Sequence, residues 1–206
     1  MAILLKIDSG KPEKKKIAAA VSVLKGGGVL AYPTETFYGL GADASNEAAI
    51  EKIFALKGRR FTNPVSVIVA DESTLEQLVT EIPTEARILM KRFWPGPLTL
   101  VFRAAPSVSA RLTASTGKIG VRISSHPIAA LLARELGAPL TATSANPSGR
   151  EETLSAAGVS ESLGGLPDMI IDGGETPGKP GSTIVDVTVS PFRILRQGAI
   201  PIGDIL

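Results

Sequence analysis

Short apolar runs that fit β-strands alternate along this chain with amphipathic segments that fit α-helices. Strands are predicted at 3–7, 28–32, 65–69, 98–102, 119–123, 139–142, 169–171, 182–188 and 192–196, and helices at 12–25, 46–57, 72–79, 83–93, 126–136 and 153–163. No period of 20–50 residues repeats, so the pattern favours one α/β domain over a repeat array. The 206 residues are enough for one sizeable core. We therefore expect a single domain over residues 1–206.

The composition is that of an ordinary soluble globular protein, with 44% apolar and 20% charged residues. Cysteine is absent, which excludes disulfides and thiolate metal sites. No apolar run approaches the roughly 20 residues that a bilayer span needs, and the N-terminus does not read as a signal peptide. These features predict a cytoplasmic protein. The net charge of +2 is too small to indicate a partner.

The segment 32–44, with the sequence YPTETFYGLGADA, follows neither a strand period nor a helix period. It begins in an apolar run and ends before an amphipathic segment. Pro33 fixes one backbone dihedral, whereas Gly39 and Gly41 allow a sharp turn or a close approach to a ligand. We expect a ligand-binding loop here.

Two fragments imitate nucleotide-binding loops without their context. Gly173 and Gly178-Lys179 have P-loop spacing, but Pro180 follows in place of a hydroxyl residue and the chain then enters a predicted strand. Gly39, Gly41 and Ala44 resemble a dinucleotide fingerprint, yet they lie too far from the preceding strand. Neither fragment predicts a nucleotide site by itself.

Cations fall at the ends of separate predicted elements. Lys57 shares the apolar face of helix 46–57 and is followed by Arg59, Arg60 and Asn63. A lysine that complements the helix dipole would explain Lys57 alone. Clustering at a junction between elements favours a function for the group.

The strand at 119–123 places two cations on one face. Lys118, Gly120 and Arg122 alternate with three apolar residues, and a glycine between two cations would give a ligand room against the strand. A solvated face is the alternative. Arg196 ends a further strand, and together these elements predict a pocket for phosphates and carboxylates.

Small polar side chains add hydrogen-bonding groups: Thr141, Thr143, Ser144, Asn146, Ser182 and Thr183. Turn formation and capping explain such residues equally well. The sole histidine, His126, precedes Pro127 at a predicted helix start, where an N-terminal role is favoured over a general base. Without paired metal ligands or a catalytic triad, the chemistry must rest on positioning and charge.

Seven motifs in order resemble the YrdC family. They are YPTETFYGLG at 32–41, KGR at 57–59, WPGPLT at 94–99, GVR at 120–122, SAN at 144–146, STIVD at 182–186 and ILR at 194–196. The resemblance extends from about residue 15 to residue 200. The chain is similar to short-form threonylcarbamoyl-AMP synthases, which lack the additional C-terminal domain of longer relatives.

The resemblance implies a fold and an activity. The expected fold is a single α/β domain with a twisted, mixed, largely parallel sheet, surrounding helices and a concave basic cavity. The expected activity condenses L-threonine, bicarbonate and ATP into threonylcarbamoyl-AMP and pyrophosphate. This is the first step in modifying the adenosine beside the anticodon of tRNAs that read ANN codons.

The resemblance also implies site residues. Threonine or its carbamate would be held by Thr34, Thr36, Arg122, Thr143 and Ser182. ATP would be held by Lys57, Arg59, Asn63, Lys118, Ser144, Asn146 and Arg196, with Lys57 and Arg59 catalytic. Mg²⁺ would arrive with the ATP phosphates rather than in a protein cage. Arg60 and Thr143 depart from the family pattern, which commonly has proline at both positions.

Partners and alternatives stay open. Threonylcarbamoyl-transferase proteins would act downstream, a contact with tRNA or double-stranded RNA is left open, and no membrane is expected. One alternative is an RNA-binding or ribosome-associated module, since a basic concave surface also suits phosphate backbones. Another is a carbamoyl-adenylate step in hydrogenase maturation.

Overall fold

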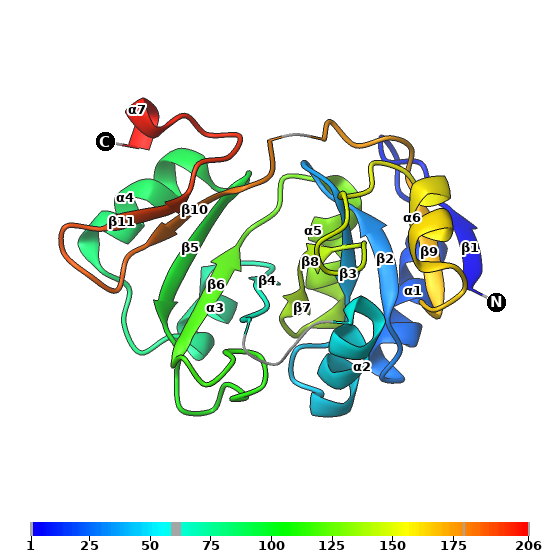
Figure 1. The fold of residues 1–206 in the computed structure, drawn as a ribbon, viewed down its shortest axis with the longest axis horizontal. Helices are drawn as coiled ribbons and strands as arrows, with labels where there is room; N and C mark the ends of the chain where they lie inside the picture. The colour runs from blue at the N-terminus through cyan, green and yellow to red at the C-terminus, as the bar shows by residue number, and fades with distance from the viewer. Residues whose placement is uncertain (1, 59–62, 179, 206) are drawn as a thin grey trace.

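The computed structural model describes residues 2–58, 63–178 and 180–205. Its strands form two sheets that lie side by side in Figure 1. The first sheet has the order β1 (Ile3–Lys6), β9 (Met169–Asp172), β2 (Leu30–Pro33), β3 (Tyr38–Gly41) and β8 (Thr143–Ser144). The second has the order β11 (Arg193–Arg196), β10 (Thr183–Asp186), β5 (Leu98–Arg103), β6 (Lys118–Arg122), β4 (Val67–Ile68) and β7 (Leu140–Thr141).

The predicted α/β class is confirmed, but the strand arrangement differs in detail from the expectation. Among the described residues four strand pairings are parallel and five are antiparallel, so neither type dominates. The strands also divide between two sheets instead of one. Two strands that were not predicted, β3 and β8, pair antiparallel at the edge of the first sheet and account for part of this difference.

The helices cover the first sheet on both faces. Helices α1 (Lys14–Lys25) and α5 (Pro127–Leu136) pack on the face that includes Tyr32. Helices α2 (Glu47–Lys57) and α6 (Ala156–Leu163) pack on the face that includes Ala31 and Leu40. Because successive strand residues point to opposite faces, both faces of β2 are buried, which explains its continuous apolar run.

The second sheet packs one face on an apolar core. Leu98, Leu100 and Phe102 of β5 point into a cluster that also includes residues of α3 (Glu72–Leu78), α4 (Thr84–Phe93) and the far side of α2. The alternate residue Thr99 points the other way. The opposite face carries the polar residues Thr99 and Arg122 together with apolar ones such as Ile184, and it turns toward the first sheet.

Helix ends follow the sequence signals. Asn46 caps α2 by accepting a hydrogen bond from the Ala49 N–H at 3.2 Å, and Gly58 ends it with a left-handed φ of 55°. Pro127 is the first residue of α5, and His126 precedes it as the N-cap residue. A short C-terminal helix, α7 (Ile202–Ile205), was not predicted. Within the described ranges, every helix is too short or too polar to cross a membrane.

The segment 32–44 is a β-hairpin over much of its length, and the predicted loop is reduced to the turn between β2 and β3. Tyr32 pairs with Gly39, and its ring lies over both glycines of β3. A Cβ atom on Gly41 would lie 2.8 Å from a Tyr32 ring carbon. Neither glycine has a positive φ. These glycines therefore make room for a buried ring. Of their two expected roles, the sharp turn is not adopted, and the close approach to a ligand stays a prediction.

The glycine-rich segment between β9 and β10, described at 173–178 and 180–182, connects the two sheets at the top of Figure 1. It is held to the hairpin turn by a hydrogen bond from the Gly178 N–H to the Thr36 carbonyl at 2.8 Å. A strand follows it, so it lacks the helix N-terminus that a P-loop requires.

Candidate functional site

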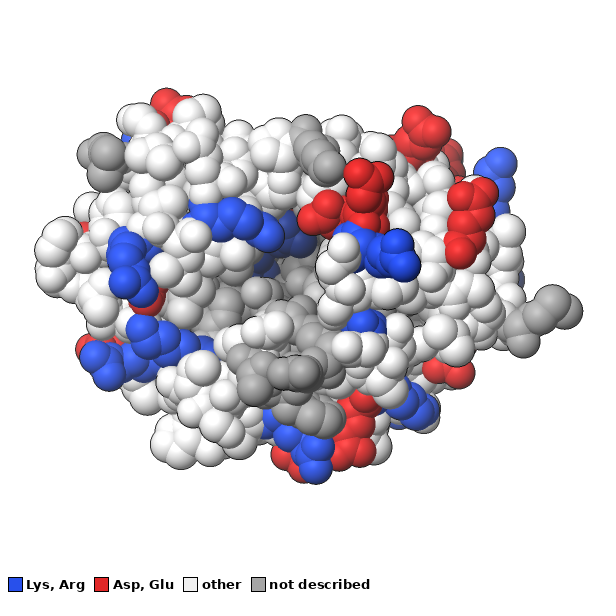
Figure 2. Space-filling model, viewed as in Figure 1, with Lys and Arg blue, Asp and Glu red and all other residues white. Residues whose placement is uncertain are grey.

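A hollow of about 260 Å³ lies between the two sheets, just below the range of about 300–1,000 Å³ that is usual for small-molecule sites. Its wall is contributed by the hairpin β2–β3, by β8 and by the polar face of the second sheet: Thr34, Thr36, Phe37, Tyr38, Gly39, Pro64, Ser66, Val67, Thr99, Arg122, Ala142, Thr143, Ser144, Glu152, Gly181, Ser182, Ile184 and Arg196. Figure 2 shows the hollow near the centre of this face, with cationic and acidic atoms beside it. The described wall is therefore of mixed charge, not uniformly basic.

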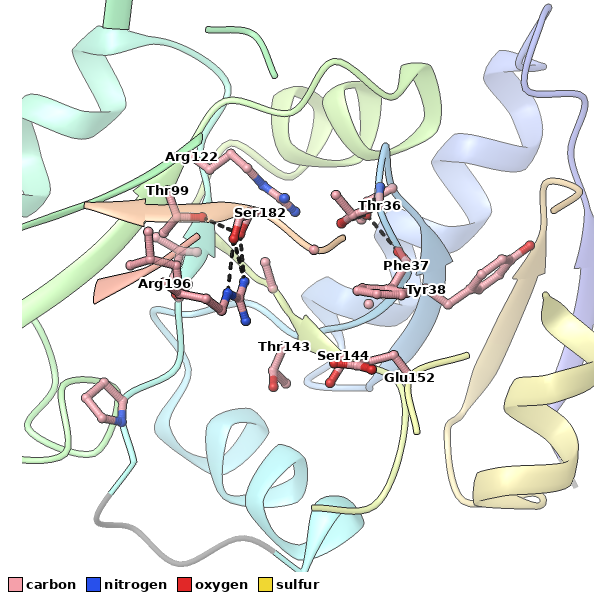
Figure 3. A pocket seen from close by; sticks show the side chains of 18 residues that line it. Thr36, Phe37, Tyr38, Thr99, Arg122, Thr143, Ser144, Glu152, Ser182 and Arg196 are labelled. Atoms are coloured by element: carbon pink, nitrogen blue, oxygen red, sulfur yellow. Dashed lines mark hydrogen bonds between the residues drawn. The ribbon is translucent and has the colours of Figure 1, made fainter. Parts of the chain in front are cut away.

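Arg122 ends β6 and points into the hollow toward Thr36 (Figure 3). The residue is only 7% exposed, so its charge needs a partner. The partner is Glu35, whose Oε1 lies 3.3 Å from Arg122 Nη1. The Ser124 hydroxyl donates a hydrogen bond to Glu35 Oε2. A carboxylate of the protein itself thus neutralises the first cation of the site.

Gly120 lies on the same face of β6 as Arg122, but the room that it leaves is filled by protein. A Cβ atom there would lie 2.6 Å from Ser66 Oγ and 3.2 Å from Thr99 Cγ2. Both of these side chains line the hollow. The expectation that a ligand lies directly against Gly120 is therefore wrong, because two small polar side chains intervene.

Arg196 reaches the hollow because of a β-bulge. Ile184 pairs with Arg196 and Val185 pairs with Ile194, so Leu195 is the extra residue in β11. With regular pairing, Arg196 and Ile194 would share the core-facing side. The bulge turns Arg196 to the side of Ile184, which lines the hollow.

The Arg196 guanidinium is fixed against Ser182. Nε and Nη2 donate to the Ser182 carbonyl at 3.0 and 2.8 Å, and Nη2 also lies 3.0 Å from Ser182 Oγ. Ser182 Oγ is in turn 3.0 Å from Thr99 Oγ1, as the dashed lines of Figure 3 indicate. Desolvation lowers the pKa of Arg196; Glu152 opposes the shift and Arg122 adds to it. Arginine remains a cation despite such a shift.

Two hydroxyls project from the hairpin turn on the opposite wall. Thr34 Oγ1 donates to the Phe37 carbonyl at 2.7 Å and lies 3.1 Å from Thr36 Oγ1. A threonine hydroxyl has one proton, so Thr34, having donated it, accepts from Thr36. The lone pairs of Thr36 Oγ1 then face the hollow as acceptors.

Lys57 lies behind the wall that contains Ser144. Its side chain is buried, and Nζ donates to the carbonyls of Ser144 and of Asn146, the latter at 2.7 Å. Its distance to Ser144 Oγ is 3.5 Å. Asn146 Nδ2 donates to the Arg150 carbonyl at 2.7 Å, which closes the following loop. The ammonium therefore supports the segment 144–146, and direct contact with ATP phosphates stays a prediction for Lys57.

The structure brings together seven of the predicted site residues in the wall of the hollow: Thr34, Thr36, Arg122, Thr143, Ser144, Ser182 and Arg196. Lys57 and Asn146 lie behind it, and Asn63 is exposed outside the lining set. Lys118 is four residues from Arg122, about 13 Å along the strand, and is paired with Asp186 at 2.9 Å. Arg59 and Arg60 lie outside the described residues.

Sequence reasoning missed several residues of the site. Glu35 stands in the turn of a motif that was singled out, but its pairing with Arg122 joins residues far apart in the sequence and could not be predicted from the motif. Ser66 and Thr99 are small polar residues at strand positions, and Phe37 and Glu152 gave no distinct signal. Glu152 and Ser144 lie on the same side of the hollow, opposite Arg196 (Figure 3).

His126 is a partly buried histidine beside Glu35. Burial lowers the pKa of His126, although the nearby Glu35 opposes this shift. Its Nδ1 is buried without a hydrogen-bond partner. Among the described residues no group of three His, Cys, Asp or Glu side chains is placed to hold a metal ion.

Comparison with known proteins adds a second line of information. The Sua5/YciO/YrdC family model, described as telomere recombination, matches residues 22–198. The chain is 43% identical over 193 residues to threonylcarbamoyl-AMP synthase of Pyrococcus abyssi, covering 94% of this chain and 57% of the relative. It is 43% identical over 186 residues to the Bacillus subtilis synthase, covering 90% and 54%.

The crystal structure of P. abyssi Sua5 complexed with L-threonine has a TM-score of 0.96 at 41% identity. The match covers 99% of this chain and 60% of that one. The chain thus spans little more than half the length of the two curated relatives.

Fold and site together define an α/β protein whose two sheets enclose a hollow lined by two arginines and a row of hydroxyls. The chain belongs to the Sua5/YciO/YrdC family. The resemblance inferred from the seven motifs is therefore confirmed.

Proposed function

We propose that this protein synthesises L-threonylcarbamoyl-AMP from L-threonine, bicarbonate and ATP, with release of pyrophosphate. The observation that carries the proposal is the arrangement of Arg122 and Arg196 on one wall, facing the hydroxyls of the hairpin turn on the other. Such a site suits two anionic reactants that must meet. The relatives named threonylcarbamoyl-AMP synthase support the same reaction.

The reaction joins two negatively charged partners. The threonine nitrogen takes up bicarbonate to give a carbamate, with loss of water, and a carbamate oxygen then attacks the α-phosphorus of ATP. The bond from that phosphorus to the bridging oxygen breaks, and pyrophosphate leaves with the electron pair. Charge repulsion opposes the approach, so cations that hold both partners in line lower the barrier.

In this scheme the wall around Arg122 holds the amino acid. Its guanidinium and the Ser182 hydroxyl would bind the carboxylate or the carbamate. The Thr36 lone pairs would accept an N–H from the substrate nitrogen, because Thr36 donates its own proton to Thr34. Thr34 and Thr143 complete the predicted amino-acid side of the hollow.

The nucleotide would occupy the side formed by Arg196 and Ser144. Arg196 supplies a fixed cation, and Lys57 keeps the Ser144 segment in place through its carbonyl bonds. Arg59, Asn63 and Lys118 are proposed as further phosphate contacts from the sequence motifs. A preorganised hydrogen-bond donor aimed at developing negative charge typically contributes about 3–4 kcal/mol to a transition state.

Magnesium is proposed to arrive as part of the ATP substrate. Oxygen-rich phosphates bind Mg²⁺ without a dedicated protein cage, which fits a wall of hydroxyls and arginines. Cytoplasmic location, tRNA contact and downstream transferase proteins are proposed on the same family basis. Each needs its own experiment.

The deciding experiment is mass spectrometry of the products from ATP, bicarbonate and threonine. We expect threonylcarbamoyl-AMP and pyrophosphate only when all three substrates are present. Omitting each in turn tests the three-component reaction, and carbamoyl phosphate in place of threonine and bicarbonate tests the hydrogenase-type alternative. RNA affinity with a steep salt dependence and no pyrophosphate release would instead favour the RNA-binding module.

A further inference from the structure

Glu35 is a partly buried acid outside the residues that line the hollow. It lies in the turn between β2 and β3, and its side chain is 12% exposed. Oε1 faces Arg122 Nη1 at 3.3 Å, and Oε2 accepts from the Ser124 hydroxyl. Both oxygens therefore point away from solvent toward the end of β6.

Ser124 is itself fixed at the start of α5. Its Oγ accepts a hydrogen bond from the His126 N–H at 3.2 Å while its proton goes to Glu35. The carboxylate is thus held between a turn of the first sheet and a segment that follows the second sheet. This contact joins the two sheets directly beside the hollow.

The contact between Arg122 and Glu35 Oε1 is an ion pair at 3.3 Å and not a hydrogen bond, so charge attraction draws one edge of the guanidinium toward Glu35. Five N–H groups lie in one plane in arginine, so holding one edge sets the direction of the other. Among the described residues, Glu35 is the one acid that forms an ion pair with Arg122. Figure 3 shows the guanidinium directed across the hollow toward Thr36.

We propose that Glu35 is a positioning residue, which anchors one edge of Arg122 so that the other edge faces the carboxylate of an α-amino-acid substrate. This inference rests on the proposed function. An unanchored arginine samples several rotamers, and the freedom lost on binding weakens affinity. The contact with Glu35 restricts the Arg122 side chain in the free protein, so less conformational entropy is lost when the substrate binds.

The main test is Glu35→Asp, which keeps the charge but withdraws the carboxylate by one methylene. From the same backbone position it cannot reach both Ser124 and Arg122. Threonine binding, measured by calorimetry, should weaken about tenfold, which is about 1.4 kcal/mol. ATP binding should change by less than about twofold. Ser124→Ala is the second variant, and it should weaken threonine binding about threefold.

A double-mutant cycle with Arg122→Lys identifies the route of the effect. If Glu35 acts through Arg122, adding Glu35→Asp to Arg122→Lys should weaken threonine binding by less than about twofold. Glu51→Asp is the matched control, because Glu51 pairs with Arg111 at 2.8 Å on the surface. It should leave threonine and ATP binding unchanged.

Three results would overturn the proposal. Threonine binding could be unchanged in Glu35→Asp, the affinities for threonine and ATP could fall together, or the full effect could persist in the Arg122→Lys background. Wild-type protein that binds threonine yet forms no threonylcarbamoyl-AMP would refute the proposed function. It would leave the role of Glu35 in amino-acid binding supported if the cycle behaves as expected.

Discussion

Replacing Lys57 by methionine should weaken the fold as well as the activity. The substitution keeps a long apolar side chain but removes the ammonium that donates to the carbonyls of Ser144 and Asn146. Each carbonyl left unpaired costs about 1–3 kcal/mol, and relief from burying a charge offsets part of the sum. We therefore expect a loss of about 2–4 kcal/mol in the free energy of unfolding.

Urea unfolding measures this loss, and Lys52→Met is the matched control. Lys52 lies on the same helix, is exposed, and donates to one carbonyl, that of Gly27, at 2.7 Å. A surface change of this kind should stay within about 0.5 kcal/mol of the wild type. An equal loss in the free energy of unfolding for Lys57→Met and Lys52→Met would refute the stabilising role of the buried Lys57 ammonium. Pyrophosphate release should be assayed at a temperature at which Lys57→Met is still folded. We expect its rate to fall at least tenfold, because segment 144–146 loses its support and Ser144 shifts in the lining of the hollow.

Three further changes have outcomes that follow from contacts already described. Gly41→Ala would place a methyl group 2.8 Å from the Tyr32 ring, so thermal melting should reveal a loss of about 1–3 kcal/mol, and an unchanged melting temperature would contradict the packing. Burial lowers the pKa of His126 in the folded protein, so the unfolded chain takes up a proton on this histidine first as the pH falls from 6.5. The free energy of unfolding should therefore decrease until the pH falls below the pKa of His126 in the folded protein. In urea unfolding at pH 7 and pH 5, His126→Gln should reduce the difference in the free energy of unfolding between the two pH values. An unchanged difference would exclude His126 as the source of the pH dependence. Arg196→Lys cannot keep the paired contacts with Ser182, so its KM for ATP should rise about tenfold in a pyrophosphate assay, whereas a wild-type KM would argue against a phosphate role.

Much of the fold was predictable because the periodic signals were strong. The ends of α2 followed from Asn46 and Gly58, and the apolar alternation of β5 and β6 gave their core faces. The strands β3 and β8 were not predictable in the same way. Tyr38–Gly41 has two glycines, which weaken strand propensity, and it is a strand because the Tyr32 ring packs over it. Tertiary packing decided that assignment.

The sequence predicted which residue types form the candidate site but not which acids form ion pairs with its cations. Two cations on one face of β6 were interpreted as part of a ligand site, with a solvated face as the alternative. In the structure Arg122 is paired with Glu35, and Lys118 is paired with Asp186. Neither acid is near its partner in sequence, so the pairs depend on how the strands and sheets are arranged.

Arg196 shows how one inserted residue can decide whether a side chain belongs to a site. Strict alternation in 193–196 would place Arg196 beside Ile194 on the core side, where an arginine without a partner would be costly. Two adjacent apolar residues, Ile194 and Leu195, break the alternation, and Leu195 is 48% exposed. A bulge resolves both problems, because it puts Leu195 at the surface and turns Arg196 toward Ser182. Two adjacent apolar residues before an arginine are therefore a sequence signal for a bulge that re-aims the arginine. Deleting Leu195 would leave a regular pairing in which Ile194 still faces Val185 and Arg196 still faces Ile184, so the contact of Arg196 with Ser182 should persist.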